Sequence, residues 1–239
     1  MNILITICAR AGSKGIPKKN IKILNGKPLI VYTLELAKKL LLNYKTFIAI
    51  SSDDKEIIEI SKKYGINSDY HRPNRLSGDN VGKVDSIRHL LLYYEKNNKH
   101  RYDFILDLDV SSPLRTINDV EKSFEKIKNN NEALSLFSVN RSNKSPYFNM
   151  VEKKKNNYFN LVKNTKNVFL SRQNSPEVYD LNASFYWYRR SFFETQNNSP
   201  ITNKSIIYKM DHICFDIDEP IDFYFLEFLI ETERIKGIL

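Results

Sequence analysis

The sequence predicts an α/β fold with a doubly wound, mainly parallel β-sheet. Short apolar runs typical of buried strands alternate with longer segments in which apolar residues recur at helical spacing. The first strand, expected over residues 3–7, leads through a glycine-bearing loop into a helix expected over residues 28–42. Such alternation favours parallel strands joined by right-handed crossover helices.

The alternation continues as far as residue 139, and further elements follow after residue 181. The patterns predict strands at 46–51, 68–71, 104–108, 134–139 and 183–188, and helices at 55–64, 83–97, 119–129 and 219–235. Between residues 141 and 181 the rhythm changes to short aromatic segments that flank polar turns, as in a hairpin. We therefore expect one domain over residues 1–239, from which residues 141–181 protrude as an arm that packs on a partner subunit.

Composition narrows the class of protein. No apolar run reaches the ~18 residues that span a bilayer, and Met1 leads directly into a strand, so we expect no signal peptide and no membrane partner. Cys8 and Cys214 lie in apolar contexts, which favours a reduced, cytoplasmic protein. The net charge of +9 leaves nucleic-acid binding as an alternative. Without a basic-aromatic motif, we interpret the charge partly as a field for small anionic substrates and expect no nucleic-acid partner.

The loop over residues 8–20 carries the strongest local signal. Gly12 and Gly15 permit positive φ and a close approach of backbone N–H groups to a ligand. Cations crowd the loop and no acidic residue precedes Glu35, so the loop suits a polyphosphate. A solvated basic turn is the simpler alternative. The spacing excludes both a P-loop and a dinucleotide-binding fingerprint.

Two pairs of alternating carboxylates follow predicted strands. Asp216 and Asp218 lie on one face of an extended segment, and such carboxylates are hard ligands suited to Mg²⁺ carrying a triphosphate. For Asp218 the alternative is a helix N-cap before Pro220. Asp107 and Asp109 form the second pair, and Asp107 alone could be a buried carboxylate satisfied by backbone groups.

A family resemblance rests on several of these segments. Residues 9–21 resemble the opening motif of the acylneuraminate cytidylyltransferases, the CMP-sialic acid synthetases and their relatives that activate legionaminic, pseudaminic and similar nonulosonic acids. Further matches lie at Arg72-Pro73, at residues 111–115 and at residues 216–218. The resemblance implies a GT-A-like nucleotidyltransferase that couples CTP to an acidic nine-carbon sugar and releases pyrophosphate. It also implies Mg²⁺ as cofactor and a homodimer that exchanges the arm.

The resemblance also implies roles for individual residues. In the expected nucleotide site, Arg10 and Lys14 hold the triphosphate as catalytic groups, Arg72 contacts the base, and Asp216 and Asp218 place the metal. The other residues of that site are Gly12, Ser13, Lys19 and Asn20, and the expected sugar site comprises Asp109, Arg172, Gln173, Asn182 and Ser184. The alternatives are a surface arginine for Arg72 and a structural arm residue for Arg172.

Two departures from the family pattern affect these expectations. The best-known members carry Gln at the position of Asp109, whereas the legionaminic-acid branch resembles this chain there. Residues 77–83 depart from the usual sequence of the family. An ionised carboxylate only accepts hydrogen bonds, which favours a legionaminic-type substrate over N-acetylneuraminic acid. The pair Asp107 and Asp109 also leaves a second function open, a metal-dependent nucleotide-sugar glycosyltransferase. The four histidines show no metal-ligand spacing, and we assign them no catalytic role.

Overall fold

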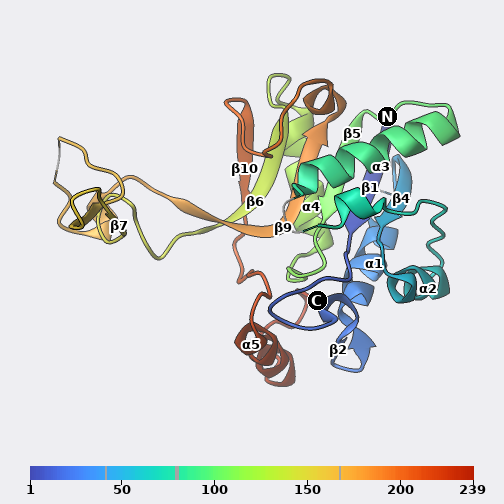
Figure 1. Cartoon of the computed structure of the whole chain (residues 1–239), viewed down its shortest axis with the longest axis horizontal. Helices are drawn as coiled ribbons and strands as arrows, with labels where there is room; N and C mark the ends of the chain where they lie inside the picture. Colours follow the sequence, from blue (N-terminus) through green and yellow to red (C-terminus); the bar gives the residue numbers. More distant parts are fainter. Residues whose placement is uncertain (41, 79–80, 167) are drawn as a thin grey trace.

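The fold is built around one mixed β-sheet. The computed structural model describes residues 1–40, 42–78, 81–166 and 168–239, and its central sheet has the strand order β10-β6-β9-β5-β1-β4 (Figure 1). The strands are β1 (Asn2–Cys8), β4 (Lys45–Ser51), β5 (Phe104–Leu108), β6 (Ser135–Arg141), β9 (Tyr179–Arg189) and β10 (Ser205–Lys209). Only β9 is antiparallel to its sheet neighbours. The predicted mainly parallel α/β sheet is therefore confirmed.

Helices cover both faces of the sheet. They are α1 (Leu29–Lys39), α2 (Lys55–Lys63), α3 (Lys83–Asn98), α4 (Ile117–Lys128) and α5 (Pro220–Glu231). In β1, Ile3 and Ile5 belong to the core cluster shared with α1, α4 and α5, whereas Leu4 packs into the cluster formed with α3. Because successive side chains of a strand point to opposite faces, this division explains why residues 3–7 form an uninterrupted apolar run.

Several element predictions require correction. Residues 68–71 do not form a strand: the segment is tied to β4 by the bonds Arg72 N to Ser52 O (3.3 Å) and Ser68 Oγ to Ile50 O (3.1 Å), which do not make a ladder. The edge strand β10 was not predicted. The sequence pattern also did not predict the short strands β2 (Ile23–Leu24) and β3 (Lys27–Pro28).

The strand β9 is longer than expected and contains an irregularity. Its pairing with β6 shifts register between Phe137 and Val139 of β6. Ala183 of β9, which lies opposite this point, has a φ of +58°. A side chain with a Cβ is disfavoured in this left-handed region. The bulge therefore separates the part of β9 inside the central sheet from the part that continues into the arm.

The predicted protrusion of residues 141–181 is visible as an arm. The ends of β6 and β9 run out of the body side by side, and a small hairpin of β7 (Val151–Lys153) and β8 (Phe159–Leu161) lies at the tip (Figure 1). Large apolar side chains on this hairpin are exposed, including Val151, Tyr158 and Phe159 at 61%, 73% and 63%. None of the helices in the described parts of the chain has the length and apolar character needed to cross a membrane.

Candidate active site

A cavity of about 570 Å³ opens at the carboxyl ends of β1 and β5. Four segments line it: the loop after β1, residues 72–78 and 81–86, the turn after β5, and the two residues before α5. This is where open α/β sheets bind ligands. Residues 79 and 80, part of the stretch that departs from the family pattern, lie outside the described residues. Of the residues singled out in the sequence, the cavity is lined by Arg10, Gly12, Ser13, Lys14, Gly15, Lys19, Asn20, Arg72, Asp109 and Asp218. Asp216 is not among its lining residues.

The loop after β1 is held in shape from both sides. The backbone N–H of Ala11 donates to Asp53 Oδ1 at 3.0 Å, and Asn20 Nδ2 donates to the carbonyl of Arg10 at 3.0 Å. The Arg10 guanidinium reaches across to the carbonyl of Ser77 at 3.3 Å. These bonds hold the backbone of the loop in a defined shape, which argues against a solvated basic turn.

The glycines of this loop do not act through positive φ, as the sequence had suggested. Neither Gly12 nor Gly15 adopts positive φ, whereas Lys18 does, at +52°. Gly15 is needed for space instead, because a Cβ there would lie 1.9 Å from the carbonyl oxygen of Asp218. At Gly12 a Cβ would meet no atom within 4 Å.

The loop and the acidic segment form one unit. The Lys19 ammonium lies 3.3 Å from Asp218 Oδ1 and also donates to the carbonyl of Ile217. Together with the backbone contact at Gly15, this ion pair fixes Asp218 at the mouth of the cavity. The cationic loop and the Asp218 carboxylate therefore meet on one side of the cavity.

Asp216 and Asp218 fit a hard divalent cation. Asp216 Oδ1 is buried without a hydrogen-bond partner, and burial raises the pKa of Asp216, as does the neighbouring Asp109 carboxylate. The side chain of Asp218 is 73% exposed. The two residues thus offer a buried carboxylate oxygen without a hydrogen-bond partner and a solvent-exposed carboxylate. Such oxygens are the ligands that Mg²⁺ prefers. Among the described residues no cluster of three or more ligating side chains occurs, so further ligands would come from substrate oxygens and water.

The capping alternative for Asp218 is wrong. The N-cap of α5 is Glu219, and Pro220 is its first residue. The carboxylate that receives the free N–H groups belongs to Asp222, which accepts from Asp218 N at 3.0 Å and from Glu219 N at 2.8 Å. The Asp218 side chain is thus not used to end the helix.

Arg72 was expected either to contact the base or to be a surface arginine, and the structure excludes the second of these. It is only 7% exposed, and its guanidinium donates to Ser51 Oγ and to the Ser51 carbonyl, both at 2.8 Å. These bonds anchor Arg72 to the end of β4 at the cavity wall.

Lys83, which sequence reasoning missed, lies between the second pair of carboxylates. Its ammonium is 2.7 Å from Asp107 Oδ2 and also contacts Asp109 Oδ2. Burial alone would lower the pKa of Lys83, yet the two carboxylates together raise it well above its ordinary value. Burial likewise opposes ionisation of Asp109, but the Lys83 ammonium outweighs it and lowers the Asp109 pKa to about 2. One feature of the sequence could have pointed to Lys83. It stands at the first position of a helix, where the helix dipole disfavours a cation, so a carboxylate partner was to be expected.

The comparisons with known proteins agree with this geometry. The sequence model of the cytidylyltransferase family matches residues 4–236. The chain belongs to the cytidylyltransferase family. It is therefore a nucleotidyltransferase, and the resemblance seen in the sequence is confirmed.

Two curated relatives match this cytidylyltransferase over 98% of its length and over 97% of their own. They are the post-translational flagellin modification protein B of Campylobacter coli, 37% identical, and the CMP-N,N'-diacetyllegionaminic acid synthase of Campylobacter jejuni, 36% identical. Among solved structures, a CMP:2-keto-3-deoxy-manno-octonic acid synthetase in complex with CTP superposes with a TM-score of 0.71 at 16% identity. The match covers 98% of this chain and all of the other, and it supports the fold.

The glycosyltransferase alternative is not favoured in this cytidylyltransferase. It required a metal between Asp107 and Asp109, and the Lys83 ammonium occupies that point. Asp107 is fully buried and accepts from Thr6 Oγ1 at 2.8 Å. Asp107 is thus buried at the end of a strand, as the alternative for it held, but its partners are the Thr6 hydroxyl and the Lys83 ammonium and not backbone groups.

Four residues expected at the sugar do not reach the cavity within one chain. Arg172 and Gln173 lie on the arm, where Arg172 donates to Asn143 Oδ1 at 3.1 Å. Asn182 and Ser184 are 4% and 0% exposed. Because their polar atoms hold β9 to its neighbours, these two side chains are not available to a substrate in this conformation.

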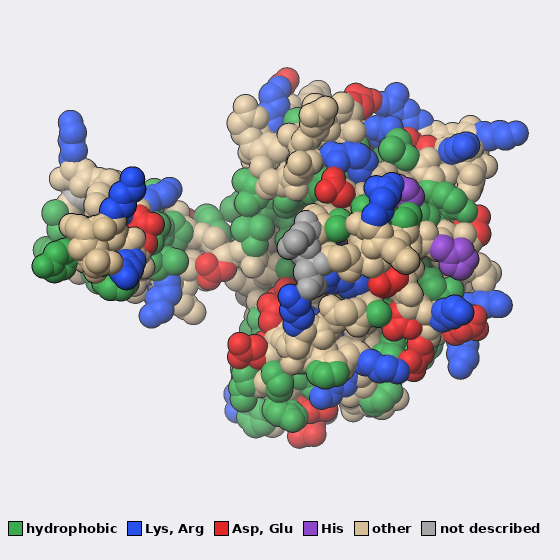
Figure 2. Space-filling view, viewed as in Figure 1, with side chains coloured by type: hydrophobic (Ala, Val, Ile, Leu, Met, Phe, Trp, Pro, Cys, Tyr) green, Lys and Arg blue, Asp and Glu red, His purple; other side chains and the backbone are tan. Residues whose placement is uncertain are grey.

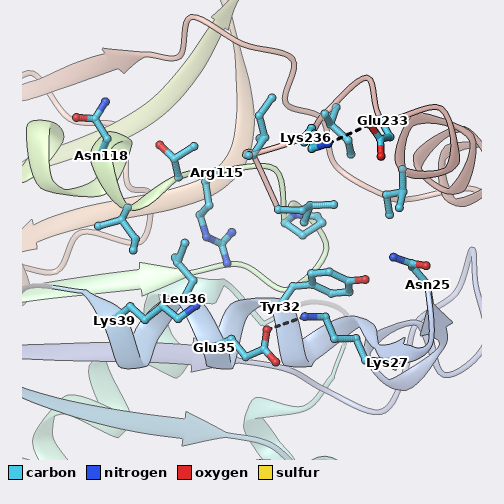
Figure 3. A pocket seen from close by; sticks show the side chains of 18 residues that line it. Asn25, Lys27, Tyr32, Glu35, Leu36, Lys39, Arg115, Asn118, Glu233 and Lys236 are labelled. Carbon is cyan, nitrogen blue, oxygen red and sulfur yellow. Dashed lines mark hydrogen bonds and ion pairs between the residues drawn. The ribbon is translucent and has the colours of Figure 1, made fainter.

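A second and larger cavity, of about 920 Å³, lies between α1, the start of α4 and residues 230–239 (Figure 3). It shares no lining residue with the first cavity. Its lysines Lys27 and Lys236 pair with Glu35 at 2.6 Å and Glu233 at 3.1 Å (Figure 3). None of the residues of the glycine-bearing cationic loop lines this larger cavity, so the polyphosphate is assigned to the first cavity.

Proposed function

We propose that this cytidylyltransferase couples CTP to a nonulosonic acid of the legionaminic type, giving a CMP-sugar and pyrophosphate. The observation that carries the proposal is the cavity at which the cationic loop meets Asp218, held together by the contact of Gly15 with Asp218, with the buried Asp216 carboxylate close behind. The name of the C. jejuni relative supports the sugar. The whole chain acts as one catalytic domain with an arm, and Mg²⁺ is the proposed cofactor.

In the proposed reaction, the C2 hydroxyl of the sugar acid attacks the α-phosphorus of CTP in line. A new oxygen–phosphorus bond forms, the hydroxyl proton is released to water, the bond to the β-phosphate oxygen breaks, and the electron pair leaves with pyrophosphate. Arg10 and Lys14 hold the triphosphate and stabilise the leaving charge. A Mg²⁺ ion held by Asp216 and Asp218 would neutralise phosphate charge and lower the pKa of the attacking hydroxyl. Positioning by the ordered loop supplies much of the remaining rate enhancement.

The sugar preference is proposed to depend on Asp109. Its Oδ1 accepts from Ser111 N at 2.9 Å and from Ser111 Oγ at 2.8 Å, and its Oδ2 contacts Lys83. The carboxylate is thus fixed at the cavity wall as a pure acceptor, and it favours sugars that present hydroxyl or amide donors. A mismatched buried contact leaves a polar group unpaired, so the discrimination is expected to be large.

Pyrophosphate release across a panel of nucleotides and sugar acids tests this function. We expect release with CTP and Mg²⁺, a higher kcat/KM with N,N'-diacetyllegionaminic acid than with N-acetylneuraminic acid, and a reduced preference in Asp109→Gln. A wild-type preference for N-acetylneuraminic acid that Asp109→Gln leaves unchanged would contradict the assigned substrate. Pyrophosphate release without any sugar acid would contradict the coupling reaction itself.

We further propose a cytoplasmic homodimer in which the arm of each copy packs on α5 of the other. On the outer face of α5, Ile221, Tyr224, Phe225 and Phe228 are 43–65% exposed, at helical spacing. The helix carries acids but no Lys or Arg, whereas the arm is rich in lysine. Figure 2 shows hydrophobic and basic side chains together on the arm, and hydrophobic and acidic ones at the lower end of the body. This arrangement would also bring Arg172 and Gln173 near the partner's cavity.

Sedimentation of charge variants tests the dimer. We expect a wild-type dimer, and dissociation in both Phe159→Asp on the arm and Tyr224→Asp on α5, because each change puts a carboxylate into a proposed apolar contact. Leu92→Asp is the control, since Leu92 is 50% exposed on α3 and outside both surfaces. A monomeric wild type, or dimers that survive both changes, would contradict the exchange.

A further inference from the structure

Lys83 makes a contact with no role in the reaction as proposed so far. One nitrogen, its Nζ, touches an oxygen of Asp107 and an oxygen of Asp109, so two carboxylates converge on a single point. That point lies at the wall of the nucleotide cavity, which both Lys83 and Asp109 line. Asp107 and Asp109 follow one another on the same face of β5 and its extension, which is why both point there.

The placement of Lys83 is unfavourable for α3 and requires another explanation. It is the first residue of the helix, where the dipole repels cations, and the N-cap Gly82 provides no side-chain cap. The interaction that offsets this cost is the pairing with two carboxylates, one of them fully buried. Without a cation, Asp107 and Asp109 would repel each other in a site of low polarity.

The geometry also matches what a small divalent ion would need. The distance from Lys83 Nζ to Asp107 Oδ2 is 2.7 Å, and Mg²⁺ or Mn²⁺ would bring such an oxygen about 0.6 Å closer, to roughly 2.1 Å. Carboxylate oxygens suit both ions. A modest movement of two side chains would therefore turn this point into a metal site if the ammonium were absent.

We propose that Lys83 is a built-in cation that occupies the point at which Asp107 and Asp109 would otherwise bind a second divalent ion. The proposal rests on the proposed function, in which Asp216 and Asp218 hold the catalytic metal. Lys83 keeps metal out of the wall that faces the sugar and holds the Asp109 carboxylate in place as a hydrogen-bond acceptor. It is thus a positioning residue that excludes a divalent ion from this wall of the cavity.

Counting bound Mn²⁺ by electron paramagnetic resonance tests this role without measuring turnover. The variant Lys83→Met removes the charge from an unbranched side chain of similar length, and we expect it to bind about one Mn²⁺ per chain more than wild type. Lys83→Arg keeps a permanent cation and is expected to show no gain. Lys204→Met is the matched control, because Lys204 pairs with Glu132 at 2.6 Å outside the cavity.

A second measurement starts from a chain that keeps Lys83, so that one of its comparisons does not depend on the folding of a Lys83 variant. The double variant Asp216→Asn/Asp218→Asn is expected to bind no Mn²⁺, and adding Lys83→Met to it is expected to create a site. No gain in a folded Lys83→Met chain would overturn the proposal, as would Mn²⁺ bound by the double variant but lost on adding Asp109→Asn. A wild type that binds no Mn²⁺, beside a Lys83→Met chain that does, would contradict only the catalytic metal at Asp216 and Asp218.

Discussion

The contact between Gly15 and Asp218 predicts a large effect from a single methyl group. In Gly15→Ala the new Cβ would lie 1.9 Å from the carbonyl oxygen of Asp218, whereas real contacts of this kind essentially never fall below 3.0 Å. The two segments must therefore move apart by about 1.1 Å. Because the obstacle is backbone and not a flexible side chain, the shift displaces Asp218 from the loop that carries Arg10 and Lys14.

The size of the effect follows from this displacement. Overpacking of a close contact costs about 1–3 kcal/mol, which corresponds to a fall in Tm of roughly 2–12 °C for a chain of this length. A misplacement of about 1 Å in a catalytic constellation lowers the rate by on the order of 100-fold. We therefore expect Gly15→Ala to remain folded at 25 °C and to lose about two orders of magnitude in kcat/KM.

The assay is pyrophosphate release at saturating Mg²⁺, with thermal unfolding of the same samples. Gly12→Ala is the comparison, because its Cβ would meet no atom within 4 Å and its Tm is expected to match wild type. Any loss in Gly12→Ala should appear in the KM for CTP, since only approach of the ligand is obstructed. A Gly15→Ala enzyme with near-normal kcat/KM and unchanged Tm would refute the argument.

Four further outcomes are expected. Asp218→Asn should abolish Mg²⁺-dependent turnover and change the free energy of unfolding by less than about 1 kcal/mol; a folded variant with near-normal turnover would exclude a metal role. Lys14→Ala should lower kcat about 100- to 1000-fold, and a loss below about tenfold would return Lys14 to the solvated-turn interpretation. The pKa of His212 is raised, chiefly by its hydrogen bond to Asp119 at 2.9 Å, so this pair stabilises the fold fully below about pH 6.5 and loses that contribution as pH rises through the raised pKa. His212→Asn should thus lower the free energy of unfolding at pH 5.5 by on the order of 1.5 kcal/mol, with a smaller difference at pH 9; a difference independent of pH would contradict this. Ala183→Gly should raise the stability by about 1 kcal/mol, because φ at residue 183 is +58°, and a lower Tm on calorimetry would show that the bulge is not strained.

The sequence alone determined the features that depend on local pattern. The apolar runs and helical spacing located β1, β4, β5 and β6 and the five helices, because periodicity reports which face of an element is buried. The change of rhythm after residue 139 marked the arm. The resemblance carried by residues 9–21 indicated the class of chemistry, and the family match confirms it. The roles of the cationic loop and of Asp216 and Asp218 stay predictions.

Only the tertiary structure decided which distant groups meet. The direction of β9 and the edge strand β10 depend on pairing with strands far away in the sequence. The space restriction at Gly15 comes from a backbone oxygen about 200 residues further along the chain. The pairing of Lys83 with Asp107 and Asp109 likewise joins the start of a helix to the end of a strand. Contacts of this kind have no local periodicity, because the free energy that fixes them arises from burial and charge in the folded molecule.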